Sequence, residues 1–169
     1  MAGQNEPDGA PLAQRELTIT RIFDAPRELV FALWTEPLHL ARWWAPEGFT
    51  NPVCEVEPRP GGAFRIVMRG PDGSEYPMRG LFVEFVRPER LVFTSIAFDG
   101  NGQPLLDGLT TVTFESLGDK TRLMLHTRVT ALVPLAGRML EGMDIGWTQS
   151  IDRLESLVSE EALKRPLAH

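Results

Sequence analysis

Apolar and polar residues alternate along most of the chain with a period of two, which is typical of β-strands that bury one face. Residues 16–23 alternate in this way, and six further segments do so between residues 52 and 130. The turns between these six segments are short and rich in Gly, Pro and Asp, so neighbouring strands are expected to run in opposite directions. The pattern predicts a curved antiparallel sheet of about seven strands.

Three segments have helical spacing instead. Residues 24–35 and 36–44 each have a proline near the start and apolar residues three or four positions apart, which predicts two short helices. Near the end of the chain a long helix is predicted, with one apolar stripe: Met139, Met143, Trp147, Ile151, Leu154 and Val158. Gly142 and Gly146 beside this stripe each weaken a helix by about 1 kcal/mol, which predicts a bend or a close backbone contact. Because no crossover helices separate the later strands, the order β-α-α-β6-α predicts an α+β fold.

Composition and charge narrow the classes of function. The 169 residues suffice for one sizeable core, and the formal net charge of -6 argues against nucleic acid as a partner. Cys54 is the only cysteine, so an internal disulfide and a cysteine-based metal site are both excluded. No run of about 18 apolar residues occurs, so no membrane partner is expected. We expect a cytoplasmic protein with a flexible tail at residues 1–14, one domain at 15–163 and a second tail at 164–169.

Five segments, in order along the chain, match the motifs of a known family. They are DAPRELVFALWTEP, RWWAPEGFT, CEVEPRPGGAFRIVMRGPDGSEYPMRG, EFVRPERLVFT and GWTQSIDRLESLV. Together the segments resemble the START-like (SRPBCC) proteins, and within these the homologues of the activator of the heat-shock chaperone ATPase, over roughly residues 17–158. The resemblance implies a helix-grip fold, in which the sheet wraps around a long C-terminal helix and leaves a cavity between them.

The resemblance also implies a function, with two alternatives left open because one fold hosts many activities. The first reading is a non-enzymatic START-like domain that binds a hydrophobic or aromatic small molecule in its cavity and needs no cofactor. The second is a stress-response protein that modulates a chaperone ATPase. In eukaryotic co-chaperones a separate N-terminal domain precedes this one, and residues 1–14 are too short to supply it. The third is an enzyme of the cyclase or hydrolase type. A homodimer is also open for a fold with exposed sheet edges.

Eight residues are candidates for the cavity lining. The period of two places Phe64 and Ile66 on the inward face of the strand AFRIVMR. Both faces of the next strand hold apolar residues, and we choose Met78 and Phe82 because Gly80 between them leaves space for a ligand or a helix. Four further candidates either line the cavity or are ordinary core residues: Trp43, Met139, Met143 and Trp147. We expect the Trp147 indole to be buried where the long helix crosses the sheet.

Catalytic chemistry finds little support in the sequence. The strand face that carries Met78 and Phe82 also carries Glu84, which is therefore expected to point inward. There its carboxylate needs an arginine partner or acts as an acid or base. His39, His126 and His169 are far apart and lack acidic neighbours at ligand spacing, so no metal site is expected. Cys54 lies in a strand beside valines, which favours a buried, inert thiol over a nucleophile.

Overall fold

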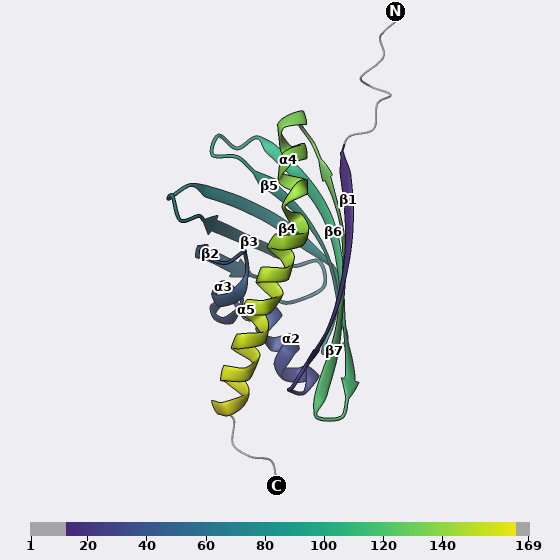
Figure 1. Ribbon diagram of the computed structural model, residues 1–169. Coiled ribbons are helices and arrows are strands. Elements are labelled where there is room, and N and C mark those ends of the chain that lie inside the picture. The colour runs from purple at the N-terminus through teal and green to yellow at the C-terminus, as the bar shows by residue number, and fades with distance from the viewer. Residues whose placement is uncertain (1–12, 165–169) are drawn as a thin grey trace, which may run out of the picture.

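Seven antiparallel strands form one curved sheet in the computed structural model, which describes residues 13–164 (Figure 1). Their order across the sheet is β1-β7-β6-β5-β4-β3-β2, so β1 and β2 are its edges. The strands are β1 (Gln14–Phe23), β2 (Thr50–Val56), β3 (Ala63–Arg69), β4 (Glu75–Val86), β5 (Arg90–Phe98), β6 (Pro104–Leu117) and β7 (Lys120–Ala131). The predicted α+β helix-grip arrangement is confirmed.

Within residues 13–164, four α-helices accompany the sheet. They are α2 (Arg27–Thr35), α3 (Pro37–Trp43), α4 (Gly137–Glu141) and α5 (Met143–Lys164), with a short 3-10 turn η2 (Pro134–Ala136) before α4. Pro26 precedes α2 and Pro37 opens α3, positions where the missing N–H costs nothing because first-turn N–H groups have no partner within the helix. Gly142 ends α4, so the long helix expected from the sequence is divided there, at one of the two glycines that predicted a bend.

The helix α5 runs along the concave face of the sheet, with α2 and α3 near one end and α4 near the other (Figure 1). Two arginines of the edge strand β1 form ion pairs with it. Arg21 Nη1 lies 2.8 Å from Asp152 Oδ1 and 2.9 Å from Glu155 Oε1, and Arg15 Nε lies 3.0 Å from Asp144 Oδ1. These contacts link the helix to one edge of the sheet.

The first strand and the last helix extend slightly beyond the bounds of the expected domain. β1 begins at Gln14 and α5 ends at Lys164, so each element extends one residue beyond the expected domain of residues 15–163. The rest of the two expected tails, residues 1–12 and 165–169, lies outside the described part of the chain.

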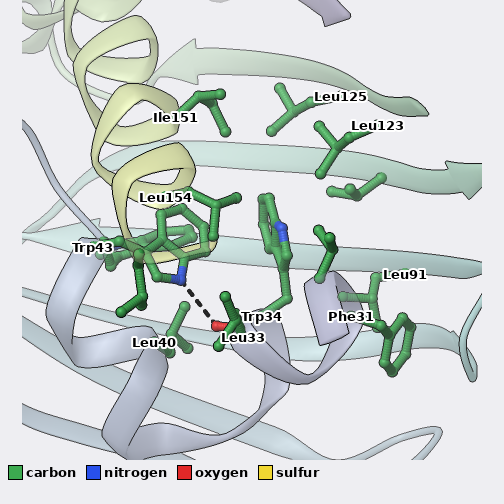
Figure 2. Packing of buried hydrophobic residues seen from close by; sticks show 14 of the residues in the cluster. Phe31, Leu33, Trp34, Leu40, Trp43, Leu91, Leu123, Leu125, Ile151 and Leu154 are labelled. Atoms are coloured by element: carbon green, nitrogen blue, oxygen red, sulfur yellow. Dashed lines mark hydrogen bonds between the residues drawn. The ribbon is translucent and has the colours of Figure 1, made fainter. Parts of the chain in front are cut away.

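The main core fills the space between α2, α3, the C-terminal half of α5 and the sheet. Figure 2 shows side chains from all of these elements meeting there: Phe31, Leu33, Trp34, Leu40, Trp43, Leu91, Leu123, Leu125, Ile151 and Leu154. Trp43 is fully buried, and its indole N–H donates a hydrogen bond of 2.9 Å to the Leu33 carbonyl. A polar group this deep is tolerated because it has a partner. The space between the sheet and the C-terminal half of α5 is therefore filled by side chains.

Candidate functional site

A pocket of about 430 Å³ occupies the other end of the space between α5 and the sheet. We call it the concave pocket. Its walls come from the concave face of β3 to β7, from α4 and α5, and from the loop that follows α3. Most of its large lining side chains are apolar: Trp44, Phe49, Met68, Met78, Phe93, Leu106, Val129, Met139, Leu140, Met143 and Trp147.

The pocket exists because the inward side chains become small along the strands. On β5, inward Leu91 and Phe93 in the core are followed by Ser95 and Ala97 at the pocket. On β6, Phe114 and Val112 in the core give way to Thr110 and Gly108. On the helix side, Gly142 and Gly146 line the pocket. Small side chains therefore face each other across the sheet–helix interface, and no bulky residue fills the gap.

Four of the eight predicted residues line the concave pocket. They are Met78 from β4, Met139 from α4, and Met143 and Trp147 from α5. Met139 is 40% exposed and lies where the pocket meets solvent. That these side chains contact a ligand stays a prediction.

The other four predicted residues lie in the core. Phe64, Ile66 and Phe82 pack beneath Trp34 and Phe93, around a void of only about 10 Å³. Trp43 points into the core between α2 and α3, and the next residue, Trp44, lines the concave pocket in its place. Gly80 does not leave space for a ligand, because a Cβ there would lie 2.0 Å from the Thr94 carbonyl oxygen and 2.4 Å from the Phe64 ring. The gap at Gly80 is occupied by the neighbouring strand and by Phe64.

Trp147 packs against the core but is only partly buried, so the expected burial of its indole is reached in part. It lies on α5 in the first turns after the break at Gly142, where small sheet residues leave it without a close-packed partner on one side. Its ring packs edge-on against Trp44 at a centroid distance of 5.4 Å. Trp44 and Trp147 thus form one aromatic wall of the concave pocket.

Glu84 points outward, which corrects its predicted inward position. Phe82 pairs with Phe93 and Glu84 with Val92, so β4 has one extra residue, Val83, in a β-bulge. A bulge shifts the alternation by one, and Phe85 then faces the core in place of Glu84. The Glu84 carboxylate accepts a hydrogen bond of 2.8 Å from Arg90 Nε at the surface. Its role is structural at this edge, and it cannot serve the concave pocket as an acid or base.

Other candidate catalytic groups also lie away from the concave pocket. His39 Nδ1 contacts Glu36 at 2.8 Å, and His126 Nε2 contacts Glu16 at 3.0 Å, both on the outside of the molecule. His169 lies outside the described residues. Burial raises the pKa of the Cys54 thiol to about 11, so at neutral pH it is protonated and weakly nucleophilic. Within residues 13–164 no group of three His, Cys, Asp or Glu side chains is placed to hold a metal ion.

Formal charge is absent from the lining of the concave pocket. Among the described residues that line it, no Asp, Glu, Lys, Arg or His occurs, and Tyr76 is the only titratable side chain. Its polar side-chain groups are the indole N–H groups of Trp44 and Trp147 and five hydroxyls: Tyr76, Ser95, Thr110, Thr127 and Ser150. The site can therefore desolvate an apolar molecule and offer it hydrogen bonds, but it cannot neutralise a charge.

A second hollow, of about 720 Å³, lies on the outer face of strands β2 to β5. It is larger, yet its lining includes Glu55, Glu57, Arg65 and Arg79. The Arg79 guanidinium lies over the Phe98 ring at 4.7 Å. We assign the apolar ligand to the concave pocket because charged side chains make the outer hollow a poor solvent for apolar groups.

Arg153 holds the loop that forms one rim of the concave pocket. Its guanidinium donates to the carbonyls of Arg42 at 3.0 Å, Ala45 at 2.8 Å and Pro46 at 2.9 Å. Ala45 has a φ of 89°, a conformation that is costly for a residue with a Cβ. Burial lowers the pKa of the Arg153 guanidinium, which nevertheless stays charged at neutral pH. Three charge-assisted hydrogen bonds therefore stabilise a strained loop beside Trp44.

Arg153→Met is expected to lower the free energy of unfolding by about 1–3 kcal/mol, because it leaves carbonyls of the rim loop without a donor. The Met side chain keeps much of the apolar stem of arginine. Urea denaturation followed by circular dichroism measures the change. The control is Arg128→Met, since the Arg128 side chain is exposed on β7 and makes no hydrogen bond or ion pair within residues 13–164. Equal stabilities of the two variants would show that Arg153 does not hold the loop.

Comparison with known proteins gives a consistent picture. The family model described as "Activator of Hsp90 ATPase homolog 1-like protein" matches residues 24–159. No match was found among curated proteins. Within residues 13–164, none of the helices combines the length and the apolar character that a membrane span requires.

Several solved structures share the fold. A protein of Chromobacterium violaceum is 30% identical over 85% of this chain and 96% of its own, with a TM-score of 0.71. One of Nitrosomonas europaea is 28% identical over 88% and 96% of the two chains, also with a TM-score of 0.71. The AHSA1 protein of Silicibacter pomeroyi is 25% identical over 89% and 100%, with a TM-score of 0.73. The sheet and the long helix are thus common to similar proteins.

Proposed function

The chain belongs to the family of activator of Hsp90 ATPase homolog 1-like proteins, and we propose that it is a non-enzymatic protein that binds a neutral, mainly apolar small molecule in the concave pocket. The observation that carries this proposal is a pocket of about 430 Å³ with apolar walls and no charged lining residue. Ligand sites of small molecules are typically clefts of roughly 300–1,000 Å³ with mainly apolar walls and a few polar groups.

The lining residues also indicate that the pocket selects a ligand by its shape rather than by its charge. Four methionines and two tryptophans line the space: Met68, Met78, Met139, Met143, Trp44 and Trp147. Methionine side chains adapt to different apolar shapes, and indole rings offer flat surfaces for stacking. An ionised ligand would lose its hydration without gaining a counter-ion, which is unfavourable.

A thermal-shift experiment tests the proposal with two naphthalenes of similar size. 2-Isopropenylnaphthalene is neutral, and 2-naphthoate carries a carboxylate. At a free concentration of 100 times its Kd, the neutral compound should stabilise the protein by about 2.7 kcal/mol, which raises Tm by roughly 5–10 °C for a chain of this size. The naphthoate should give a much smaller shift. No shift with the neutral compound, or a larger one with the anion, would contradict the proposal.

Modulation of a chaperone ATPase is the second candidate function, and the description of the matching family supports it. It requires a surface that binds the chaperone, independently of the concave pocket. A change in ATP turnover when the purified protein is added to an Hsp90-type chaperone would support it. Unchanged turnover together with no complex in size-exclusion chromatography would remove it. We infer a reducing compartment such as the cytoplasm from the single, half-buried cysteine.

A further inference from the structure

The hydroxyl pair of Thr110 and Thr127 lies in the floor of the concave pocket. Thr110 on β6 and Thr127 on β7 are directly opposite each other in the antiparallel register. Both side chains point to the concave face, and both residues line the pocket. Their Oγ1 atoms are 2.8 Å apart, and the residues are only 2% and 1% exposed. The two hydroxyls thus form one buried polar group in walls that are otherwise mainly apolar.

This pair has one hydroxyl proton to spare. When one threonine donates its proton to the other, the second hydroxyl still has a proton of its own. Within residues 13–164 neither Oγ1 atom makes any other side-chain hydrogen bond. The remaining buried donor needs an acceptor, because an unpaired buried donor costs about 1–3 kcal/mol. Both threonines line the concave pocket, so a molecule bound there can supply this acceptor.

The neighbouring position on β6 adds no side chain over the pair. Gly108 lies two residues from Thr110 on the same face of β6 and has no side chain to cover the pair. A Cβ at Gly108 would lie 3.0 Å from Ser95 Oγ and 3.6 Å from Val129 Cγ2, so even a methyl group would crowd this part of the floor. On the opposite wall the Ser150 hydroxyl already donates to the Gly146 carbonyl at 3.0 Å. Of the three buried hydroxyl side chains in the lining, those of Thr110, Thr127 and Ser150, the spare proton therefore belongs to the threonine pair on the sheet side.

We propose that the Thr110–Thr127 pair donates a hydrogen bond to the ligand, and that the ligand is a neutral carbonyl compound whose oxygen faces the sheet and whose apolar body faces α5. This assignment rests on the proposed function. A neutral carbonyl oxygen accepts a hydrogen bond without bringing a charge into a lining that has no counter-ion. A pure hydrocarbon would leave the spare proton unpaired.

The test compares two neutral probes of nearly the same shape, 2-acetylnaphthalene and 2-isopropenylnaphthalene. The first has a carbonyl oxygen at the position where the second has a methylene group. Their Kd values are measured by tryptophan fluorescence for the wild type and for Thr110→Val/Thr127→Val. The double substitution removes both hydroxyls together and keeps the side-chain shape, so it leaves no unpaired partner behind. The ratio of the ketone Kd to the alkene Kd should be roughly three- to tenfold higher in the double variant, as expected for one lost hydrogen bond.

The matched control is Thr121→Val. Thr121 is a third buried threonine, also on β7, but its hydroxyl donates to the Ala25 carbonyl at 2.7 Å outside the concave pocket. This variant should keep the wild-type ratio. A double variant with the wild-type ratio would overturn the assignment while leaving the proposed function in place. If neither neutral probe binds the wild type, the proposed function fails and the assignment with it.

A measurement on the wild type alone covers the case in which the double variant does not fold. The infrared carbonyl stretch of bound 2-acetylnaphthalene should lie at lower frequency than in cyclohexane, because hydrogen bonding weakens the C=O bond. A stretch at the cyclohexane frequency would show that no donor reaches the carbonyl and would overturn the assignment.

Discussion

Trp43→Ala should lower the free energy of unfolding by about 3–5 kcal/mol, the range typical of large aromatic residues removed from a core. Trp43 is fully buried, and its ring centroid lies 4.6 Å from that of Trp34 and 5.7 Å from that of Trp44. Its removal leaves a cavity and leaves the Leu33 carbonyl without its donor. Because a domain is typically stable by about 5–15 kcal/mol, the loss is a large fraction of the total. Urea denaturation with a fitted midpoint and slope measures it.

Trp147→Ala is the matched comparison, because the same side chain is removed from the wall of the concave pocket. Trp147 is half-buried and already borders empty space, so its loss creates less new cavity. It should cost clearly less stability than Trp43→Ala, while it weakens the binding of 2-isopropenylnaphthalene. Equal losses of stability in the two variants, with unchanged binding in Trp147→Ala, would show that Trp147 is a core residue. The assignment of the pocket wall would then be wrong.

Gly108→Val is expected to weaken the binding of 2-isopropenylnaphthalene by about tenfold or more. The added side chain would compete with the bound ligand for the same space, and overpacking typically costs about 1–3 kcal/mol. The new side chain would project into the floor of the concave pocket from the centre of the sheet, between Ser95 and Val129. Valine suits a strand, so the fold should be retained. Fluorescence titration measures the Kd, and far-ultraviolet circular dichroism checks the fold.

Ser116→Val provides the control for Gly108→Val. Ser116 lies on the same strand but is exposed, near the turn to β7 and outside the concave pocket. This change adds the same side chain without touching the pocket, so the Kd should remain that of the wild type. If Gly108→Val bound the naphthalene as tightly as Ser116→Val, the ligand would have to bind elsewhere.

The sequence predicts the sheet and its helices well because their patterns are local. Alternation in AFRIVMR places Phe64 and Ile66 inward, and the structure buries both. The two prolines before and within the short helices mark their starts. The glycine at 142 marks the division of the C-terminal helix. Each of these features depends on neighbours within a few positions along the chain.

The errors arise where the outcome depends on contacts between distant segments. The bulge at Val83 reverses the side of Glu84, and alternation within β4 gives no sign of it because both faces hold apolar residues. Trp43 and Trp44 are adjacent and chemically identical, and only the packing of α3 against the core decides that Trp44 faces the pocket. Trp147 lies on the predicted stripe but borders the concave pocket, whose lining on the sheet side includes the small residues Ser95, Ala97 and Gly108.

One sequence signal could have located the concave pocket. Inward positions of β5 read Leu91, Phe93, Ser95 and Ala97, so the side chains shrink along the strand. The strand β6 runs the other way, and its inward positions grow from Gly108 through Thr110 to Phe114. In an antiparallel pair the small ends of both strands meet at one end of the sheet. Comparing residue size between paired strands, rather than hydrophobicity within one, would have indicated the hollow end.

The central claim is that a neutral apolar molecule binds between α5 and the concave face of the sheet. Its most direct test is a titration of nitrogen-15-labelled protein with 2-isopropenylnaphthalene, followed by two-dimensional NMR. Saturable shifts are predicted for the amides of Gly108, Thr127 and Gly146 and for the Trp147 indole, all of which border the concave pocket. Shifts confined to Leu81 and Ile96, on the outer face of the sheet, would contradict the claim, and so would a spectrum that does not change.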